Sequence, residues 1–168
     1  MGNIPAEDVE QYIEQVKTIG NATRYPEEWM IAVVHVALFA ESSSSCQVGW
    51  YSCDSLGDQY RLSFDHHAVV NSCVKRLRSK AQYTSLPLHL AAPEFSLSDA
   101  QRVYEMLLSA KLEKKSFRRR LLDSGIVLPL NKERRSHARP AQLFKLKPAH
   151  IIHHFRRNML GKHKDIVK

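Results

Sequence analysis

The stretch FSLSDAQRVYEMLLSAKLEKKSFRRRLLDSGIV, residues 95–127, decides the fold of this chain. Ser96 or Ser98 can cap a first helix, because a serine oxygen accepts hydrogen bonds from the unpaired N–H groups of a first turn. The apolar residues of that helix recur at spacings of three and four: Val103, Tyr104, Met106, Leu107 and Leu108. After a short turn the pattern predicts a second helix from Lys114 to Asp123, with Gly125 as its left-handed C-terminal cap.

Two strand-like segments follow this helix-turn-helix, running from Ile126 to Leu130 and from Gln142 to Leu146. Pro129 predicts that the first is an edge strand, because proline has no backbone N–H to donate to a neighbouring strand. The connecting residues 131–140, NKERRSHARP, are polar and strongly basic. Two helices followed by a hairpin with a basic tip predict a winged helix.

The predicted second helix has two different faces. At about 100° per residue, Phe117, Leu121 and Leu122 cluster on one side, and Ser116, Arg119 and Arg120 lie on the other. Arg118 lies within the apolar arc, so we expect its stem to pack and its guanidinium to reach a phosphate. The arginine fork matches the guanine edge or a phosphate, and the major groove of DNA admits a helix. The pattern therefore predicts a recognition helix.

We expect ten side chains of the second helix and the hairpin to contact DNA. They are Lys114, Lys115, Ser116, Arg118, Arg119, Arg120, Lys132, Arg134, Arg135 and Arg139. Such a hairpin usually follows the sugar-phosphate backbone, so it adds charge and register more than base reading. Because each neutralised phosphate releases counterions, binding should weaken steeply as salt rises.

The charge distribution agrees with this interpretation. Residues 1–100 carry 7 Lys and Arg against 12 Asp and Glu, whereas residues 101–168 carry 18 against 5. An acidic half followed by a basic half predicts two modules, of which the second meets a polyanion. The sequence contains no phosphate-binding glycine-rich loop and no nucleophile elbow, so we expect neither an enzyme nor a bound cofactor.

The apolar runs, the N-terminal residues and the cysteines of the sequence indicate where in the cell the protein is located. No apolar run approaches the roughly 20 residues needed to cross a bilayer, and the N-terminal residues lack the pattern of a signal peptide. Cys46, Cys53 and Cys73 are an odd number of cysteines, which we interpret as free thiols. We therefore expect a cytoplasmic protein that does not contact a membrane.

The first half of the sequence predicts strands followed by a helix. The segment from Gln15 to Ile19 indicates a short strand, and the apolar run from Met30 to Ala40 indicates a strand buried on both faces. A further strand is predicted from Gln47 to Tyr51. Asp65 is a candidate cap for a helix from His66 to about Tyr83.

The sequence resembles the Nudix-related transcriptional regulators, the NrtR family, in both halves. Residues 95–127 and RPAQLFKLKP at 139–148 resemble the C-terminal domain of that family. YIEQVKTIGNATRYP at 12–26, MIAVVHVALFA at 30–40, Trp50 and FDHHAVV at 64–70 are similar to the second half of its Nudix-like domain. The resemblance covers roughly residues 8 to 155, and KSFRRR with RPAQLFKL are its most specific parts.

The resemblance implies an α+β protein in which a partial Nudix-like α/β sandwich precedes a winged helix-turn-helix. We expect the partial Nudix-like domain over 1–83, a linker over 84–95, and the winged helix with a final helix, from Pro148 to about Met159, over 96–168. It implies a repressor that binds a palindromic operator as a homodimer and controls genes of NAD-cofactor or sugar metabolism. In the family the Nudix-like domain senses ADP-ribose or a related nucleotide, and Arg24 is the candidate effector contact here.

The sequence departs from the family in three places. The pattern G-x5-E-x7-R-E-x2-E-E-x-G, the Nudix box, does not occur in it, which removes the expected pyrophosphate-holding residues. Arg24-Tyr25-Pro26 stands where the family tends to have Arg-Asp-Pro, and Ala138 stands where a glycine commonly precedes Arg-Pro-Ala. The first departure bears on effector sensing and the third on the turn that enters the second wing strand.

Two other functions were weighed. A Nudix hydrolase fragment would need clustered glutamates to hold magnesium, and that cluster is absent from the sequence. An interaction module that dimerises with a full-length regulator remains open. Metal binding is not expected, because Cys46 and Cys53 lack the spacing of a zinc pair, and His150 with His154 fit a polar helix face or a dimer seam better.

Overall fold

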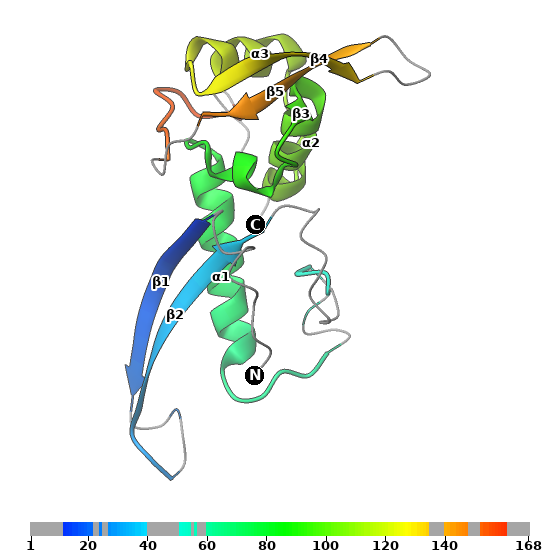
Figure 1. Cartoon of the computed structure of the whole chain (residues 1–168). Helices are drawn as coiled ribbons and strands as arrows, with labels where there is room; N and C mark the ends of the chain where they lie inside the picture. The colour runs from blue at the N-terminus through cyan, green and yellow to red at the C-terminus, as the bar shows by residue number, and fades with distance from the viewer. Residues whose placement is uncertain are drawn as a thin grey trace. The chain divides into compact units, whose positions relative to one another are not determined.

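The computed structural model describes residues 12–21, 24, 27–39, 51–54, 56, 60–134, 140–147 and 152–160. These residues form two compact units, the first containing those up to Leu77 and the second those from Arg78 onward. The elements, drawn in Figure 1, are β1 (Tyr12–Asn21), β2 (Met30–Leu38), α1 (His66–Ala81), the 3-10 helix η2 (Leu86–Leu90), β3 (Phe95–Ser96), α2 (Leu97–Leu108), α3 (Lys114–Asp123), β4 (Val127–Arg134) and β5 (Ala141–Leu146). Among the described helices, none is long and apolar enough to span a membrane.

The first unit contains the antiparallel pair β1 and β2 and most of α1 (Figure 1). Two polar contacts join β1 to α1: Lys17 Nζ donates to Ser72 Oγ at 2.9 Å, and Arg76 Nη2 donates to Glu14 Oε1 at 2.8 Å. The strand predicted from Met30 is confirmed. The segment predicted as a strand from Gln47 lies outside the described residues, apart from Tyr51, which is not in a strand.

The prediction that β2 is buried on both faces is wrong. Its side chains alternate between exposed and half-buried positions, with Ile31 and Val33 each more than half exposed. Trp29 and Ile13 are also more than half exposed. The alternation arises because a strand places successive side chains on opposite faces, and among the described residues only one face is packed.

The second unit contains η2, the two helices of the predicted helix-turn-helix, and a three-stranded antiparallel sheet of order β3-β5-β4 (Figure 1). The edge position predicted from Pro129 is confirmed, because among the described strands β4 pairs with β5 alone. Strand β3 was not predicted, since two residues carry no periodicity. We call the β4–β5 hairpin the wing.

Ser96 and Gly125 act as the sequence predicts, whereas the Asp65 carboxylate accepts from Arg24, and its other oxygen has no hydrogen-bond partner among the described residues. Ser96 caps α2: its Oγ accepts from Asp99 N–H at 3.2 Å, and the Asp99 carboxylate accepts from Ser96 N–H at 3.0 Å, a reciprocal capping box. Helix α3 has the predicted bounds, and Gly125 follows it with φ of +65°. Such a left-handed residue lets the chain leave the helix and enter β4.

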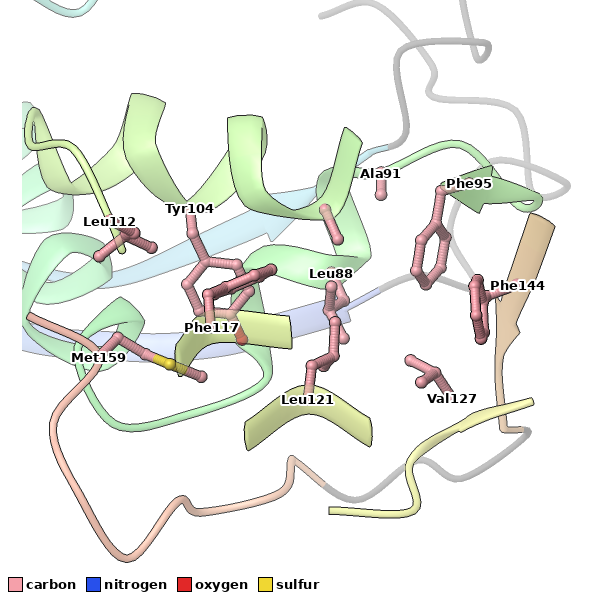
Figure 2. Close-up of a cluster of buried hydrophobic side chains, with 11 residues drawn as sticks. Leu88, Ala91, Phe95, Tyr104, Leu112, Phe117, Leu121, Val127, Phe144 and Met159 are labelled. Atoms are coloured by element: carbon pink, nitrogen blue, oxygen red, sulfur yellow. The ribbon is translucent and has the colours of Figure 1, made fainter. Parts of the chain in front are cut away.

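The core of the second unit lies between η2, α2, α3 and the sheet (Figure 2). Tyr104 of α2 and Phe117 of α3 pack edge to face, with ring centroids 5.2 Å apart. The Tyr104 hydroxyl donates to the Thr84 carbonyl at 2.8 Å, which satisfies the polar end of a fully buried side chain. Leu121 and Phe95 are also fully buried, so α3 is fixed to this core by one face.

Residues 84–95, predicted as a linker, pack within the second unit instead. Leu86 and Leu88 are buried, and Thr84 is fully buried with its hydroxyl donating to the Lys80 carbonyl at 2.7 Å. Pro87, one of the two prolines that suggested a linker, lies in the first turn of a buried 3-10 helix, whereas Pro93 follows that helix and is exposed. A proline near a helix start costs no hydrogen bond, which explains the misreading.

The predicted final helix is also wrong for residues 152–160, the part of it that the structure describes. His154 bridges to Thr84, Phe155 N–H donates to the Tyr83 carbonyl at 2.8 Å, and Met159 N–H donates to the Gln82 carbonyl. These bonds to the segment after α1 replace the bonds of a helix. They also allow Met159 to be buried against the core.

Candidate nucleic-acid interface

Glu113 caps the N-terminus of α3, a role that the sequence did not predict. Its carboxylate accepts hydrogen bonds from the backbone N–H groups of Lys115, at 2.9 Å, and Ser116, at 2.6 Å. These two bonds hold the pKa of Glu113 below its ordinary value. The cap fixes the first turn of α3, which carries Lys114 and Lys115 as exposed side chains.

The outward side of α3 carries Arg119, which is exposed, and the partly exposed Ser116. The inward side carries Phe117 and Leu121, both buried, as predicted. Leu122 was assigned to the apolar face, but it is 47% exposed. It lies about 140° around the helix from Phe117, beyond the edge of the stripe that the core covers.

Arg118 is partly buried between α3 and the start of α2. Its Nη2 donates to Ser98 Oγ at 3.0 Å. Its Nε atom is buried and has no hydrogen-bond partner among the described residues. The stem therefore packs as expected, while the guanidinium contacts a serine hydroxyl at the N-terminal end of α2.

Arg120 points to a different partner from the one predicted. Its Nη1 donates to the backbone carbonyl of Asn158. Asn158 Nδ2 donates in turn to Gln82 Oε1 at 2.9 Å, so Arg120 helps to hold residues 152–160 against the unit. Of the two arginines that the sequence places outward, the structure leaves Arg119 exposed and engages Arg120 in an internal contact.

The wing carries Lys132 and Arg134, and both pair with acidic side chains of the same unit. Lys132 Nζ lies 2.7 Å from Glu94 Oε1, and Arg134 Nη1 lies 3.0 Å from Asp99 Oδ2. Both cations stay about half exposed or more, so these pairs are surface contacts that a phosphate can replace. Arg135, His137 and Arg139 lie outside the described residues.

Asp99 joins the wing to the start of α2. Burial of its carboxyl tends to raise its pKa, but hydrogen bonds from Ser96 and the charges of Arg134 and Arg102 outweigh burial and lower it. The carboxylate therefore stays ionised and holds Arg134, the last residue of β4, against the start of α2.

Helix α3 and strand β5 of the wing line one cleft of about 620 Å³. Lys114, Arg118 and Leu122 line it from α3, and Ala141 and Gln142 line it from β5. Arg134 is the β4 partner of Ala141 in the hairpin register. Cations of α3 and strand β5 of the wing thus line a common cleft, and Arg134 pairs with one of its lining residues.

Arg24, the candidate effector contact, belongs to the first unit. Its Nε donates to Asp65 Oδ2 at 2.8 Å, and this hydrogen bond lowers the pKa of Asp65. The Arg24 side chain is only 12% exposed. Its charge is therefore already balanced by the residue that precedes α1.

The described residues contain no group of three or more His, Cys, Asp and Glu side chains placed to hold a metal ion. Cys46 and His150, weighed as metal ligands from the sequence, lie outside the described residues.

Comparison with known proteins identifies the family. The structure matches the crystal structure of NrtR from Shewanella oneidensis in complex with a 27mer DNA, with a TM-score of 0.81 and 32% identity, over 91% of this chain and 74% of that one. The chain belongs to the NrtR family. The crystal structure of Shewanella oneidensis NrtR alone matches with a TM-score of 0.80, over 88% of this chain and 70% of that one.

The family model for the NrtR DNA-binding winged helix domain matches residues 87–146. The ADPR responsive transcriptional repressor NtrR of Acinetobacter baylyi is 37% identical over 140 residues, which are 80% of this chain. The chain spans 56% of the length of that relative. These NrtR relatives agree with the interpretation of a regulator rather than an enzyme.

A MutT/nudix family protein from Enterococcus faecalis shares the fold, with a TM-score of 0.61 and 18% identity over 82% of this chain. Together with the NrtR matches, it confirms the predicted α+β class, a Nudix-like portion followed by a winged helix.

Proposed function

We propose that this chain is a sequence-specific DNA-binding transcriptional repressor of the NrtR type. The observation that supports this most is the common cleft, since Lys114 and Arg118 of α3 border it together with β5 of the wing. A helix that presents exposed cations beside a basic hairpin can enter a groove while the hairpin follows the backbone.

The contacts divide the proposed roles. Arg119 is the exposed arginine of α3, and we assign base reading to it. We assign phosphate contacts to Lys114, Lys115, Ser116 and Arg118 of α3 and to Lys132 and Arg134 of β4. Arg135 and Arg139, which lie outside the described residues, are proposed to add further phosphate contacts. Arg120 holds the Asn158 carbonyl and is assigned a positioning role.

The repressor is proposed to act in the cytoplasm as a homodimer on a palindromic operator of NAD-cofactor or sugar metabolism genes. Two-fold symmetry would place half-sites about one helical turn apart. The Acinetobacter baylyi relative is described as ADPR responsive, which supports an ADP-ribose-like nucleotide as the effector. For Arg24 to bind such an effector, the anion would have to compete with the Asp65 carboxylate.

The test is selection of binding sites from a pool of random duplexes, followed by anisotropy titration of the selected duplex. Wild type should enrich a palindrome. Arg119→Ala should cost about 1–3 kcal/mol of binding free energy and relax preference at one base pair. Lys111→Ala, which removes an exposed charge from the turn before α3, is the matched control and should change affinity little.

Arg120→Ala separates the base reading assigned to Arg119 from the positioning role assigned to Arg120. It should lower the unfolding temperature by releasing residues 152–160, and weaken binding less than Arg119→Ala does. If Arg119→Ala binds as wild type does, the recognition assignment is wrong. If no duplex is enriched, the proposed function itself is wrong.

A further inference from the structure

The cleft beside α3 differs from a uniformly basic surface in its lining. Three elements meet there: the start of α2, the outward edge of α3 and the start of β5. Its lining combines polar side chains, among them Ser98, Lys114 and Arg118, with an apolar wall that includes Leu97, Leu122 and Pro140. This composition suits a ligand with an anionic group joined to an apolar body.

Arg118 supplies the first reason to expect an anion. Its Nη2 is held by Ser98 Oγ at 3.0 Å, while its Nε is buried with no partner among the described residues. A buried N–H without an acceptor is costly, and that cost is recovered when an acceptor arrives. The guanidinium is therefore already oriented by Ser98, with a hydrogen-bond donor left unused.

The start of α2 supplies the second reason. Ser96 Oγ caps the N–H of Asp99, which leaves the N–H groups of Leu97 and Ser98 as the remaining donors of the first turn. A helix N-terminus favours an anion, and the Ser98 hydroxyl lies at the same end. The nearby Asp99 carboxylate is engaged by Ser96 and Arg134, so its charge is balanced locally.

Lys114 supplies a second positive charge, and its side chain is exposed at the first turn of α3. Leu97, Leu122 and Pro140 give the cleft its apolar wall. Exposed leucine in a basic surface is explained if it packs on a deoxyribose. A free inorganic anion would make no apolar contact with these side chains.

We propose that this cleft binds one backbone phosphate of the DNA and its attached sugar, with Ser98, Lys114 and Arg118 as the phosphate ligands. The site deepens the proposed function and rests on it. It fixes the register of α3, so that a single contact outside the groove determines which base pair Arg119 faces.

The experiment replaces single phosphates of the selected duplex by neutral methylphosphonates, one position at a time. With wild type, one position in each half-site should lower affinity by about tenfold, the size expected for losing a charge-assisted contact. With the double variant Ser98→Ala/Lys114→Gln, that position should lose its effect, while the other sensitive positions keep theirs. Lys111→Gln, which removes a charge outside the cleft, should reproduce the wild-type profile.

Arg118→Gln gives a second measurement, and its thermal unfolding must be followed because the stem is packed. A folded Arg118→Gln should lose sensitivity at the same position as the double variant. If wild type binds the duplex and both variants keep the wild-type profile, the phosphate site is wrong and the proposed function stands. If wild type binds no duplex, both the phosphate site and the proposed function are wrong.

Discussion

The two units of this chain differ in how the described residues cover their apolar side chains. In the second unit Phe95, Tyr104 and Leu121 are buried to within 1% of full burial. In the first unit the β1–β2 pair leaves Ile31 and Val33 more than half exposed. The second unit thus closes a core of its own, and removing part of that core should cost far more than trimming the exposed sheet face.

The largest expected effect separates the units directly. Phe117→Ala removes a buried ring that packs on Tyr104, and should lower the free energy of unfolding by about 3–5 kcal/mol. Val33→Ala, on the exposed face of β2, should change it by less than about 0.5 kcal/mol. Urea unfolding followed by fluorescence and by circular dichroism measures both.

Equal costs for the two substitutions would contradict the comparison. A large cost for Val33→Ala would mean that the exposed face is covered in solution. Light scattering on the same samples would then show whether a second copy provides the cover.

The same contrast explains which parts of the fold the sequence could predict. Helix α3 has the predicted bounds because its apolar spacing, its charged face and Gly125 all agree. Met106 was misassigned to the buried face of α2 and is 63% exposed, since it lies about 200° around the helix from Tyr104. Residues 84–95 were misassigned because local composition does not reveal that Leu86 and Leu88 face a distant core.

The candidate site was predictable only as a set of cations. Sequence spacing placed Arg119 and Arg120 together, and could not show that Arg120 donates to a backbone carbonyl 38 positions away. It also could not reveal Ser98 as the partner of Arg118, although Ser98 had been weighed as a cap. Contacts between residues far apart in the sequence carry no local pattern. For the same reason the sequence did not predict that Glu94, in the segment predicted as a linker, pairs with Lys132.

The second prediction compares one glycine from each unit. Gly125 has φ of +65°, and among the described residues the one atom that an added Cβ would meet is Lys147 Nζ, at 3.9 Å. Gly125→Ala should therefore cost about 1–2 kcal/mol of unfolding free energy through backbone strain alone. Gly20, in β1, would place its Cβ 3.4 Å from Ile31 Cγ1. Gly20→Ala should be neutral or slightly stabilising, because alanine loses less backbone freedom in a strand.

Thermal unfolding of the two alanine variants checks this ordering. Gly125→Asn is the useful control, since asparagine tolerates the left-handed region and should recover part of the loss. If Gly20→Ala is the more damaging change, packing rather than backbone conformation limits both sites.

The smallest expected effect concerns an acidic group from each unit. Asp99 has a pKa below its ordinary value of 3.8 and links Ser96 to Arg134, whereas Glu14 makes an ion pair with Arg76 on the first unit. A carboxyl whose folded pKa is lowered stabilises the fold fully above its unfolded pKa. That contribution is lost as pH falls through the folded pKa. Asp99→Asn should therefore cost about 1 kcal/mol at pH 7, because the charged cap and its ion pair are both weakened.

The pH dependence tests whether the charge of Asp99 stabilises the fold. The difference in unfolding free energy between wild type and Asp99→Asn should stay constant from neutral pH down to about 4 and shrink below it. Glu14→Gln should cost less, about 0.5 kcal/mol, and its cost should fall with added salt, because Arg76 is 47% exposed. Unfolding curves between pH 3 and 7, at two salt concentrations, measure both. If the Asp99 difference persists unchanged at the lowest pH, the shape of the side chain rather than its charge explains the cap, and a contact other than that carboxylate holds Arg134 at the end of β4.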